Sequence, residues 1–268
     1  RDVLGSRGLG DVYKRQGYTS LDFERYDLSN KTFEELLEDL FSLLTDGIDL
    51  DSRKKSGSER TPNDIISYML NLIGYHGKDI LGKTITDPAC GTGTFIAQIT
   101  NRIIDATKEN DRAELANRII NNKCIIAYDT KPSNVFVTKT VIVALLLHRH
   151  CISNIKDVVR LIDNLPVYCS DYLTIHDMTD YIVGNPPYIR LQNLSNENRN
   201  YIKSNYLSST GRFDIYTCFL ENGDKNLKPS GKMCLITSNK FLTANYGVGI
   251  RQYLANSGHV RKIIDLYD

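Results

Sequence analysis

The strongest constraint on the fold is a glycine-rich segment at residues 87–95, whose sequence is DPACGTGTF. A short apolar strand pattern at residues 84–87 leads into it, and a helical pattern of apolar residues from Phe95 to Ile104 follows it. Glycines allow the backbone to turn tightly between a strand and a helix. The segment therefore predicts the first half of a strand-helix-strand unit, which builds a parallel sheet.

Further stretches of the chain repeat this alternation of strand and helix. Short buried strands are expected at residues 124–128, 167–169, 181–184, 233–237 and 263–266. Helical patterns separate most of them. Alternation of this kind predicts an α/β fold with a mostly parallel sheet that is covered by helices on both faces.

The first sixty residues are expected to lie outside this sheet. Residues 11–16, DVYKRQ, match the translation of a transposon end that is used to prepare DNA sequencing libraries. Residues 1–16 are therefore interpreted as translated adapter and excluded from the fold. Residues 17–60 are predicted to form a helical segment and a linker, because Thr32 and Glu35 have the spacing of a capping box.

The main domain is expected to begin at Thr61. This residue is suited to the N-cap of a helix and Pro62 to its first helical position, and apolar residues at helical spacing follow them. The sequence thus predicts a helix that precedes the first strand of the sheet.

Composition excludes several classes of protein. Hydrophobic residues make up 41% of the 268 residues and charged residues 24%, which is typical of a folded globular chain. The longest apolar run, residues 141–147, is far shorter than the roughly 20 residues of a membrane span. The 6 cysteines form no CxxC pair, so no metal site or disulfide framework is predicted and a reducing cytoplasm is expected.

The acid that opens the glycine-rich turn indicates what the turn binds. Ligands of such sheets lie outside the carboxyl ends of the strands, where glycines let backbone N–H groups approach them. The segment lacks the lysine of a P-loop and the third glycine of a dinucleotide fingerprint. Because Asp87 would repel a phosphate, a cationic group such as an ammonium or a sulfonium is the expected ligand.

Two further acids follow predicted strands. Asp129 lies where a carboxylate accepts hydrogen bonds from a ribose diol in nucleotide-binding sheets. Asp171 follows the third strand and is suited to an adenine amino group, although a loop aspartate that caps the next turn is an equal alternative.

The most specific motif is NPPY at residues 185–188, directly after an apolar strand. Two consecutive prolines keep the Pro186 carbonyl out of a helix or a strand ladder, so it is left as a hydrogen-bond acceptor. The Asn185 side chain offers a second acceptor, and Tyr188 offers a flat ring. This set suits a planar group that carries an amine, such as a flipped adenine, whereas a plain turn after a strand is the alternative interpretation.

These motifs, in this order, resemble those of the gamma group of DNA adenine-N6 methyltransferases. Those enzymes use S-adenosylmethionine and occur in restriction-modification and phage-defence systems, type IIG enzymes among them. The resemblance rests on the TP, DPACGTGTF and NPPY segments and covers about residues 56–268. It implies a Rossmann-like S-adenosylmethionine-dependent methyltransferase fold, with a catalytic domain at residues 61–268 that stops before the target-recognition region.

The resemblance also assigns the cofactor site. S-adenosylmethionine is expected to be bound by Thr61, Pro62, Asp87, Ala89, Gly91, Gly93, Phe95, Asp129 and Asp171. In the family, the TP segment contacts the methionine part of the cofactor and the first acid lies near its ammonium group. The second acid binds the ribose, and the third reads the adenine of the cofactor.

The catalytic residues implied by the resemblance are Asn185, Pro186, Pro187 and Tyr188, with Tyr188 also holding the target base. Asn185 and the Pro186 carbonyl are expected to accept the two hydrogens of the adenine N6 amine and to aim its lone pair at the methyl group. Phe241, in the segment SNKF, matches the family aromatic that helps to hold the base, although an ordinary core position is an equal alternative.

Double-stranded DNA is the expected partner, together with a restriction or specificity subunit or domain, and no membrane. From residue 189 onward the chain has 11 basic and 6 acidic residues, a net charge of +5 that suits a polyanion. One alternative is an NPPY methyltransferase that acts on a release-factor glutamine or on ribosomal RNA. A second alternative is a binding fragment without activity.

Overall fold

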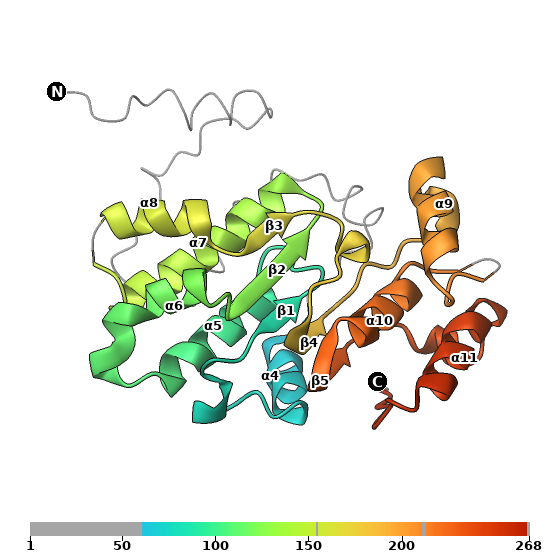
Figure 1. Ribbon diagram of the computed structural model, residues 1–268, viewed down its shortest axis with the longest axis horizontal. Coiled ribbons are helices and arrows are strands. Elements are labelled where there is room, and N and C mark those ends of the chain that lie inside the picture. The colour runs from blue at the N-terminus through green and yellow to red at the C-terminus, as the bar shows by residue number, and fades with distance from the viewer. Residues whose placement is uncertain (1–60, 154, 211–212, 267–268) are drawn as a thin grey trace. The chain divides into compact units, whose positions relative to one another are not determined.

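The computed structural model describes residues 61–153, 155–210 and 213–266 (Figure 1). All of these residues lie in one structural unit, Lys54–Asp268. The expected adapter at residues 1–16 and the expected helical segment at residues 17–60 lie outside the described residues.

The centre of the fold is a five-stranded sheet with the strand order β3-β2-β1-β4-β5. The strands are β1 (Ile85–Asp87), β2 (Ile125–Asp129), β3 (Val167–Cys169), β4 (Thr179–Gly184) and β5 (Leu227–Leu235). All neighbouring strands pair in parallel. The chain order reverses between β1 and β4, and the carboxyl ends of these two strands are where ligands bind in open sheets of this kind.

The sequence predicted the positions of the first four strands correctly, but it placed the start of the fifth strand too late. β5 begins at Leu227, six residues before the predicted start, because Lys228, Pro229 and Ser230 break the apolar pattern by which a buried strand is recognised. The prediction of a strand at residues 263–266 is wrong. Ile263 and Leu266 are 59% and 54% exposed, and no strand of the described chain pairs with this segment.

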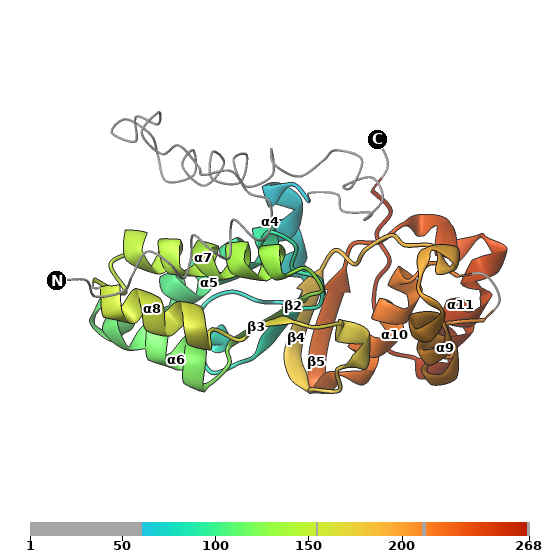
Figure 2. The same cartoon turned by 90° about the horizontal axis from the view of Figure 1, so that it is seen from above.

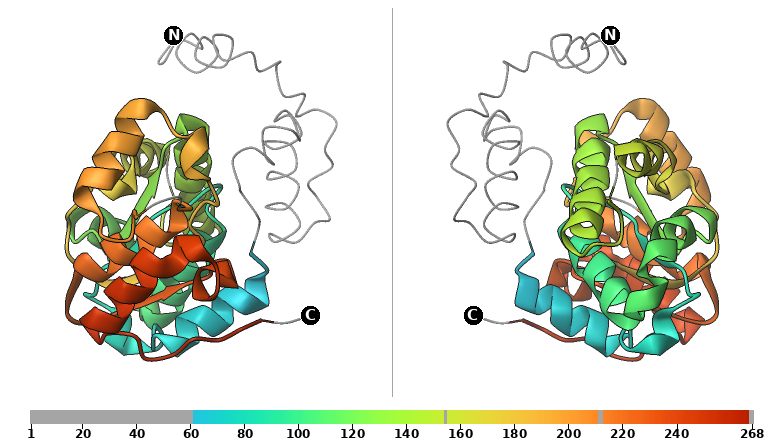
Figure 3. Two further views of the ribbon diagram at one scale, coloured as in Figure 1. Left: turned by 90° about the vertical axis from the view of Figure 1, so that its right-hand side faces the viewer. Right: turned by 90° about the vertical axis from the view of Figure 1, so that its left-hand side faces the viewer.

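Helices cover both faces of the sheet. They are α4 (Asn63–Leu72), α5 (Thr94–Ala106), α6 (Leu115–Asn121), α7 (Pro132–His148), α8 (Ile155–Asn164), α9 (Asn196–Asn205), α10 (Tyr216–Lys225) and α11 (Val248–Ser257). α4, α5 and α7 lie on one side of the strands, and α9 and α10 on the other (Figures 2 and 3). The predicted α/β architecture with helices on both faces is confirmed.

Strand β2 shows how the two faces are filled. Side chains alternate between the faces of a strand, and Ile126 and Tyr128 pack with Phe219 of α10 in one apolar cluster. Ile125 and Ala127 are also buried and therefore face the side that is covered by α5 and α7. Burial on both faces produces the continuous apolar run by which the sequence located this strand.

The first helix of the described chain begins one residue later than predicted. Pro62 occupies the N-cap with φ −58° and ψ 147°, and α4 starts at Asn63, so the assignment of Thr61 as the N-cap is wrong. The Thr61 hydroxyl instead accepts a hydrogen bond from Asn185 Nδ2 at 3.2 Å. A tertiary contact has therefore taken the side chain that the local pattern had assigned to the helix.

Within the described residues, no helix has the length and apolar character needed to cross a membrane, and the longest helix, α7, has 17 residues.

A polar cluster ties three strands together at the amino ends of β1 and β4. Asp180 Oδ2 accepts hydrogen bonds from Thr84 N at 2.9 Å, from Thr84 Oγ1 at 2.8 Å and from Lys228 Nζ at 2.8 Å. Burial alone would raise the pKa of Asp180, but the bonds from Lys228 and Thr84 outweigh it and hold the pKa well below its usual range. The ionised carboxylate therefore stabilises the folded state.

Replacement of this carboxylate by an amide, Asp180→Asn, is expected to lower the free energy of unfolding at pH 7 by about 1–3 kcal/mol. A depressed pKa stabilises the fold above the unfolded pKa of about 4, and that contribution is lost as the pH falls below it. Urea unfolding at pH 7, 5 and 3 should thus show a difference in free energy of unfolding between the wild type and Asp180→Asn that becomes smaller towards pH 3. Asp163→Asn, at an exposed carboxylate of α8, is the control. A difference between Asp180→Asn and the wild type that is equal at all three pH values would contradict the stabilising role of the ionised Asp180.

Candidate functional site

The glycine-rich turn and the NPPY segment meet at the carboxyl ends of β1 and β4. Asp87 is the last residue of β1 and Gly184 the last of β4, and the two strands are neighbours in the sheet. A Cβ at Gly184 would lie 2.7 Å from Asp87 Oδ1, so only a glycine allows this approach. Two motifs that are far apart in the sequence therefore share one site.

Asp87 is the buried centre of that site. Its carboxylate is 0% exposed, and Oδ1 accepts a hydrogen bond from Ala89 N at 3.1 Å. Oδ2 is also buried and has no hydrogen-bond partner within the described chain. Burial, with a smaller contribution from the negative charge of Asp129, raises the pKa of Asp87 to about 7, against the Ala89 N–H. The site is thus short of positive charge and of one hydrogen-bond donor.

The turn that follows Asp87 has the backbone shape that its glycines predict. Gly91 and Gly93 have φ values of 54° and 88°, in the left-handed region. A Cβ at Gly93 would lie 3.0 Å from Thr138 Oγ1 of α7, and that hydroxyl donates to the Gly91 carbonyl at 3.1 Å. α5 starts directly after the turn and buries Phe95. The turn is therefore clamped between two helices.

Asp129, at the end of β2, holds the same turn from the other side. Its Oδ2 accepts from Gly91 N at 3.0 Å, and its Oδ1 accepts from Lys131 N at 2.8 Å and from Asn134 Nδ2 at 3.1 Å. Burial raises the pKa of Asp129, and these donors oppose the rise. A carboxylate offers about four acceptor positions, so one remains for a ligand hydroxyl.

Asp171 adopts the capping role that was left open as an alternative. Its Oδ1 accepts a hydrogen bond from Leu173 N at 3.0 Å at the start of the short 3₁₀ helix η4 (Tyr172–Thr174). Burial raises the pKa of this carboxyl group, against the Leu173 N–H. A contact with an adenine amino group stays a prediction.

Asn185 is oriented by partners from two distant parts of the chain. Its Nδ2 donates to Thr61 Oγ1 at 3.2 Å, and its Oδ1 accepts from the Tyr188 hydroxyl at 3.0 Å. The Tyr188 hydroxyl also lies 3.5 Å from the Ile236 carbonyl. These two contacts fix the direction of the Asn185 amide before any ligand arrives. Sequence reasoning missed both contacts, because neither follows from local spacing.

The two residues after Asn185 are the prolines of the NPPY motif. Pro186 is buried and Pro187 half-buried, and both peptide bonds are trans. Within the described chain, no donor forms a hydrogen bond with the Pro186 carbonyl. That carbonyl and the Asn185 oxygen are therefore two acceptors on adjacent residues.

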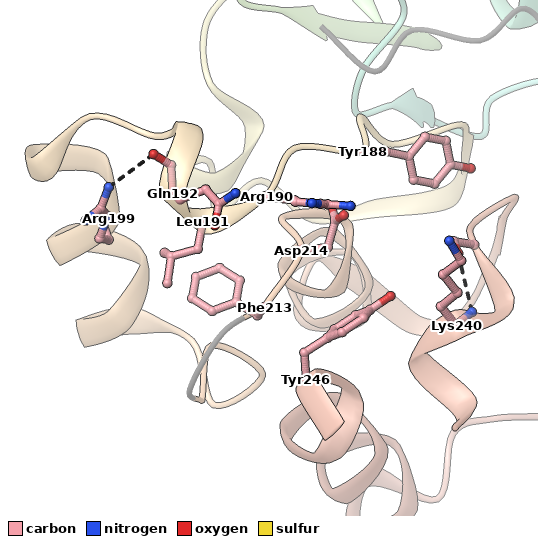
Figure 4. Close-up of a pocket in the computed structure, with 10 residues that line it drawn as sticks. Tyr188, Arg190, Leu191, Gln192, Arg199, Phe213, Asp214, Lys240 and Tyr246 are labelled. Atoms are coloured by element: carbon pink, nitrogen blue, oxygen red, sulfur yellow. Dashed lines mark hydrogen bonds between the residues drawn. The ribbon is translucent and has the colours of Figure 1, made fainter. Parts of the chain in front are cut away.

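A cavity of about 850 Å³ opens beside Tyr188 (Figure 4). Its lining consists of Tyr188, Arg190, Leu191, Gln192, Arg199, Phe213, Asp214, Ser238, Lys240 and Tyr246. Polar, basic and aromatic side chains thus surround a space that is large enough for a nucleobase.

Phe241 occupies the core position that was left open as an alternative. Phe241 is only 8% exposed and packs edge-on against Tyr216, with ring centres 6.4 Å apart, and it is not among the lining residues. Tyr216 in turn packs edge-on against Tyr188 at 5.7 Å. Tyr246 faces the cavity, and its hydroxyl lies 2.9 Å from that of Tyr216. Sequence reasoning missed Tyr246, which lies five residues after Phe241 in a segment without periodicity.

The arrangement fits a nucleoside that carries a cationic group. The unpaired Asp87 oxygen and the negative charges of Asp87 and Asp129 suit a cation, and the left-handed turn at Gly91 and Gly93 leaves backbone room for it. Asp129 suits a ribose hydroxyl. Within the described residues, no group of three metal-ligating side chains comes together.

Comparison with known proteins identifies relatives in restriction-modification systems. A family model described as the Eco57I restriction-modification methylase matches residues 123–268. The chain is 29% identical to the type II methyltransferase M.BanIII of Aneurinibacillus aneurinilyticus over 81% of its own length. It is 24% identical to M.BstVI of Geobacillus stearothermophilus, again over 81%. The matched parts are 36% and 39% of those relatives, so the chain spans well under half of their length.

The fold matches solved structures as well. The modification methyltransferase subunit of a type I restriction-modification system from Streptococcus thermophilus superimposes with a TM-score of 0.54. The sequences are 17% identical, and the match covers 87% of this chain and 45% of that one. The Rossmann-like methyltransferase fold that the motifs implied is thereby confirmed.

The burial of Asp87 should make stability depend on pH. A raised carboxyl pKa means that the folded state holds a proton between pH 4 and 7 that the unfolded state releases, so stability falls as the pH rises. A pKa of about 7 corresponds to a loss of about 4 kcal/mol. Asp87→Asn removes this loss, so its stability relative to the wild type should be greater at pH 8 than at pH 5.

Urea unfolding of both proteins at the two pH values measures this difference. Asp163→Asn, at the exposed carboxylate of α8, should show no such change between pH 5 and 8. A difference between Asp87→Asn and the wild type that does not vary with pH would show that Asp87 is already ionised in the folded protein.

Proposed function

Because the chain belongs to the Eco57I restriction-modification methylase family, we propose that it methylates the N6 nitrogen of an adenine flipped out of double-stranded DNA. S-adenosylmethionine is the proposed methyl donor, and a restriction-modification or related defence system is the proposed setting. The observation that carries this proposal is the contact between the NPPY segment and the glycine-rich turn at Gly184 and Asp87. It supports the proposal because the amine of the base and the cationic nucleoside would then be held next to each other.

The cofactor side of the site would be formed by the turn and the acids around it. S-adenosylmethionine supplies an activated methyl group on a sulfonium centre. Asp87 and Asp129 contribute the negative field that a sulfonium and an ammonium need. The remaining proposed contacts are Thr61, Pro62, Ala89, Gly91, Gly93, Phe95 and Asp171. Thr61 would also orient the catalytic side chain, because its hydroxyl accepts a hydrogen bond from the Asn185 amide.

The base side would be the cavity between Tyr188 and Tyr246 (Figure 4). Flipping a base out of a duplex costs a few kcal/mol, and stacking on an aromatic ring contributes about 1–3 kcal/mol per base. Tyr188 is therefore proposed to stack on the base and Tyr246 to close the second face. Phe241 supports this wall from behind through Tyr216.

Catalysis would come from two oriented acceptors. The adenine N6 amine is a poor nucleophile because its lone pair is delocalised into the ring. If Asn185 Oδ1 and the Pro186 carbonyl each accept one N–H, the nitrogen becomes more tetrahedral and its lone pair turns towards the methyl group. The same two oxygens stabilise the positive charge that develops on nitrogen. The surplus proton is then acidic enough to pass to water, so no strong base is required.

Basic residues at the rim of the cavity would bind the DNA backbone. Arg190 and Lys240 are exposed, and Arg199 is held by the carbonyls of Gln192 and Leu194. Phosphate contacts position a protein on DNA, and base contacts give specificity. A restriction or specificity subunit or domain is the further proposed partner.

Methyl transfer tests this proposal directly. The chain is incubated with methyl-tritiated S-adenosylmethionine and genomic DNA from a methylation-deficient host, and the DNA is digested to nucleosides. Label is expected in N6-methyladenine. Asn185→Ala should lower kcat at least 100-fold, because it removes one of two acceptors, and should leave cofactor affinity within about 3-fold. Asn122→Ala, at an exposed amide after α6, is the matched control.

Three outcomes would reject parts of the proposal. Label in N4-methylcytosine would reject adenine as the target. Label in ribosomal RNA or in a release factor, but not in DNA, would reject the substrate class. Full activity of Asn185→Ala would reject the catalytic assignment.

The two aromatic residues of the wall should behave differently. Tyr246→Ala removes a cavity-lining ring and should raise KM for DNA about 10-fold, which corresponds to the loss of about 1.4 kcal/mol of stacking. Phe241→Ala removes a buried ring and should lower the free energy of unfolding by about 3–5 kcal/mol. Kinetics and urea unfolding on both variants separate the roles, and a KM effect confined to Phe241→Ala would reverse the assignment.

A further inference from the structure

Asp214 is a cavity-lining carboxyl group that the proposed mechanism does not use. It lies between the rings of Tyr188 and Tyr246 in the view of Figure 4. Its backbone forms an isolated antiparallel bridge with Arg190, and Ile215 N donates to the Ile189 carbonyl at 2.9 Å. The position of this carboxyl group is therefore fixed relative to the segment that directly follows the NPPY motif.

One oxygen of this carboxyl group has no explanation within the protein. Asp214 Oδ1 is buried and has no hydrogen-bond partner among the described residues. Nearly all buried polar atoms in folded proteins are paired, so an unpaired one in the wall of a cavity indicates a ligand. The oxygen lies beside a cavity that two tyrosines shape for a flat ring.

A purely structural role explains only part of the geometry. The backbone N–H groups of Tyr216, Ile189 and Ile215 lie near the carboxyl group, as expected for a residue just before α10. Such N–H groups can satisfy one oxygen of a carboxyl group, although α10 has Ile215 at its N-cap and no side-chain cap hydrogen bond. They give no reason for Oδ1 to be buried without a hydrogen-bond partner.

We infer that Asp214 is a specificity-determining residue of the cavity, whose carboxyl group donates a hydrogen bond to a ring nitrogen of the base held between Tyr188 and Tyr246. This inference rests on the proposed function. Asn185 and Pro186 already take both hydrogens of the amine, so the ring nitrogens are the polar atoms of an adenine that remain to be recognised. Asp214 supplies that recognition from its fixed position beside the segment that follows the motif.

The contact needs a proton on the Asp214 carboxyl group, and a hydrogen bond to the ring nitrogen would itself hold that proton in place. Burial raises the pKa of Asp214, against the neighbouring backbone N–H groups and the charge of Arg190. Arg190 itself is exposed and forms no ion pair with Asp214 within the described chain. A ring nitrogen that accepts a hydrogen bond from the protonated carboxyl group would provide the partner that the buried oxygen lacks.

Short single strands test the contact without a need to know the DNA sequence that is recognised. The probes are fluorescein-labelled nine-residue strands of thymidine with a central deoxyadenosine or a central abasic residue. Fluorescence anisotropy gives their dissociation constants for the full chain in the presence of S-adenosylhomocysteine. The wild type is expected to bind the deoxyadenosine strand at least 5-fold more tightly than the abasic strand.

Two variants of Asp214 give the decisive ratios. Asp214→Ala is expected to reduce the preference for deoxyadenosine to less than 2-fold, with little change in affinity for the abasic strand. Asp214→Asn keeps a donor of nearly the same shape and should retain at least half of the preference. Asp163→Asn, on α8, should leave the ratio unchanged. Circular dichroism and urea unfolding confirm that each variant is folded.

The other outcomes overturn the inference. Equal weakening of both strands by Asp214→Ala would show a structural cap, and an unchanged ratio would show no contact. A loss in Asp214→Asn as large as in Asp214→Ala would show that the carboxyl group does not act as a donor. If the wild type itself does not distinguish the strands, the cavity is not a base pocket and the proposed function fails with it. If only the role of Asp214 is wrong, the wild type still prefers the deoxyadenosine strand to the abasic strand and still transfers methyl groups.

Discussion

The close approach of Gly184 to Asp87 is the constraint on which the site depends. β1 and β4 pair in parallel with Ile85 opposite Tyr181 and Thr86 opposite Ile182, so both strands end at the same edge of the sheet. The absence of a side chain at Gly184 lets the Asp87 carboxylate lie beneath the start of the NPPY segment. Strand register and one missing Cβ together set the separation between the glycine-rich turn and the NPPY segment.

The pKa of an aspartate is shifted in opposite directions at the two ends of the sheet. Asp180, at the amino ends, lies beside Lys228, and its pKa is held well below the usual range despite burial. Asp87, at the carboxyl ends, has no ion-pair partner among the described lysines and arginines, and burial raises its pKa to about 7. One end is thus complete without a ligand, whereas the other lacks a positive charge. Paired charges stabilise a fold, and an unpaired buried charge marks a site that a ligand completes.

The sequence predicted the parts of the site that follow from strand ends, and it failed where tertiary packing decides. Asp87, Asp129 and Asn185 could be brought together in advance because the carboxyl ends of parallel strands share one edge. Phe241 and Tyr246 could not be distinguished, since which ring is buried depends on packing against Tyr216. The apolar run at residues 263–266 looked like a strand, but an extended segment becomes a strand only where a partner offers its backbone.

The turn that carries Tyr246 is held by contacts that lie away from the cavity lining. Arg251 donates to the carbonyls of Phe241 at 2.6 Å and Ala244 at 2.9 Å, which fixes the turn that carries Tyr246. The fully buried Glu221 accepts from the backbone N–H groups of Leu207 and Ser208, in the segment between α9 and α10. A Cβ at Gly249 would meet the carbonyls of those two residues at 2.9 and 3.0 Å, so α11 packs closely against that segment. Because charged side chains hold both segments through hydrogen bonds to the backbone, the position of Tyr246 depends on packing across the carboxyl-terminal part of the fold.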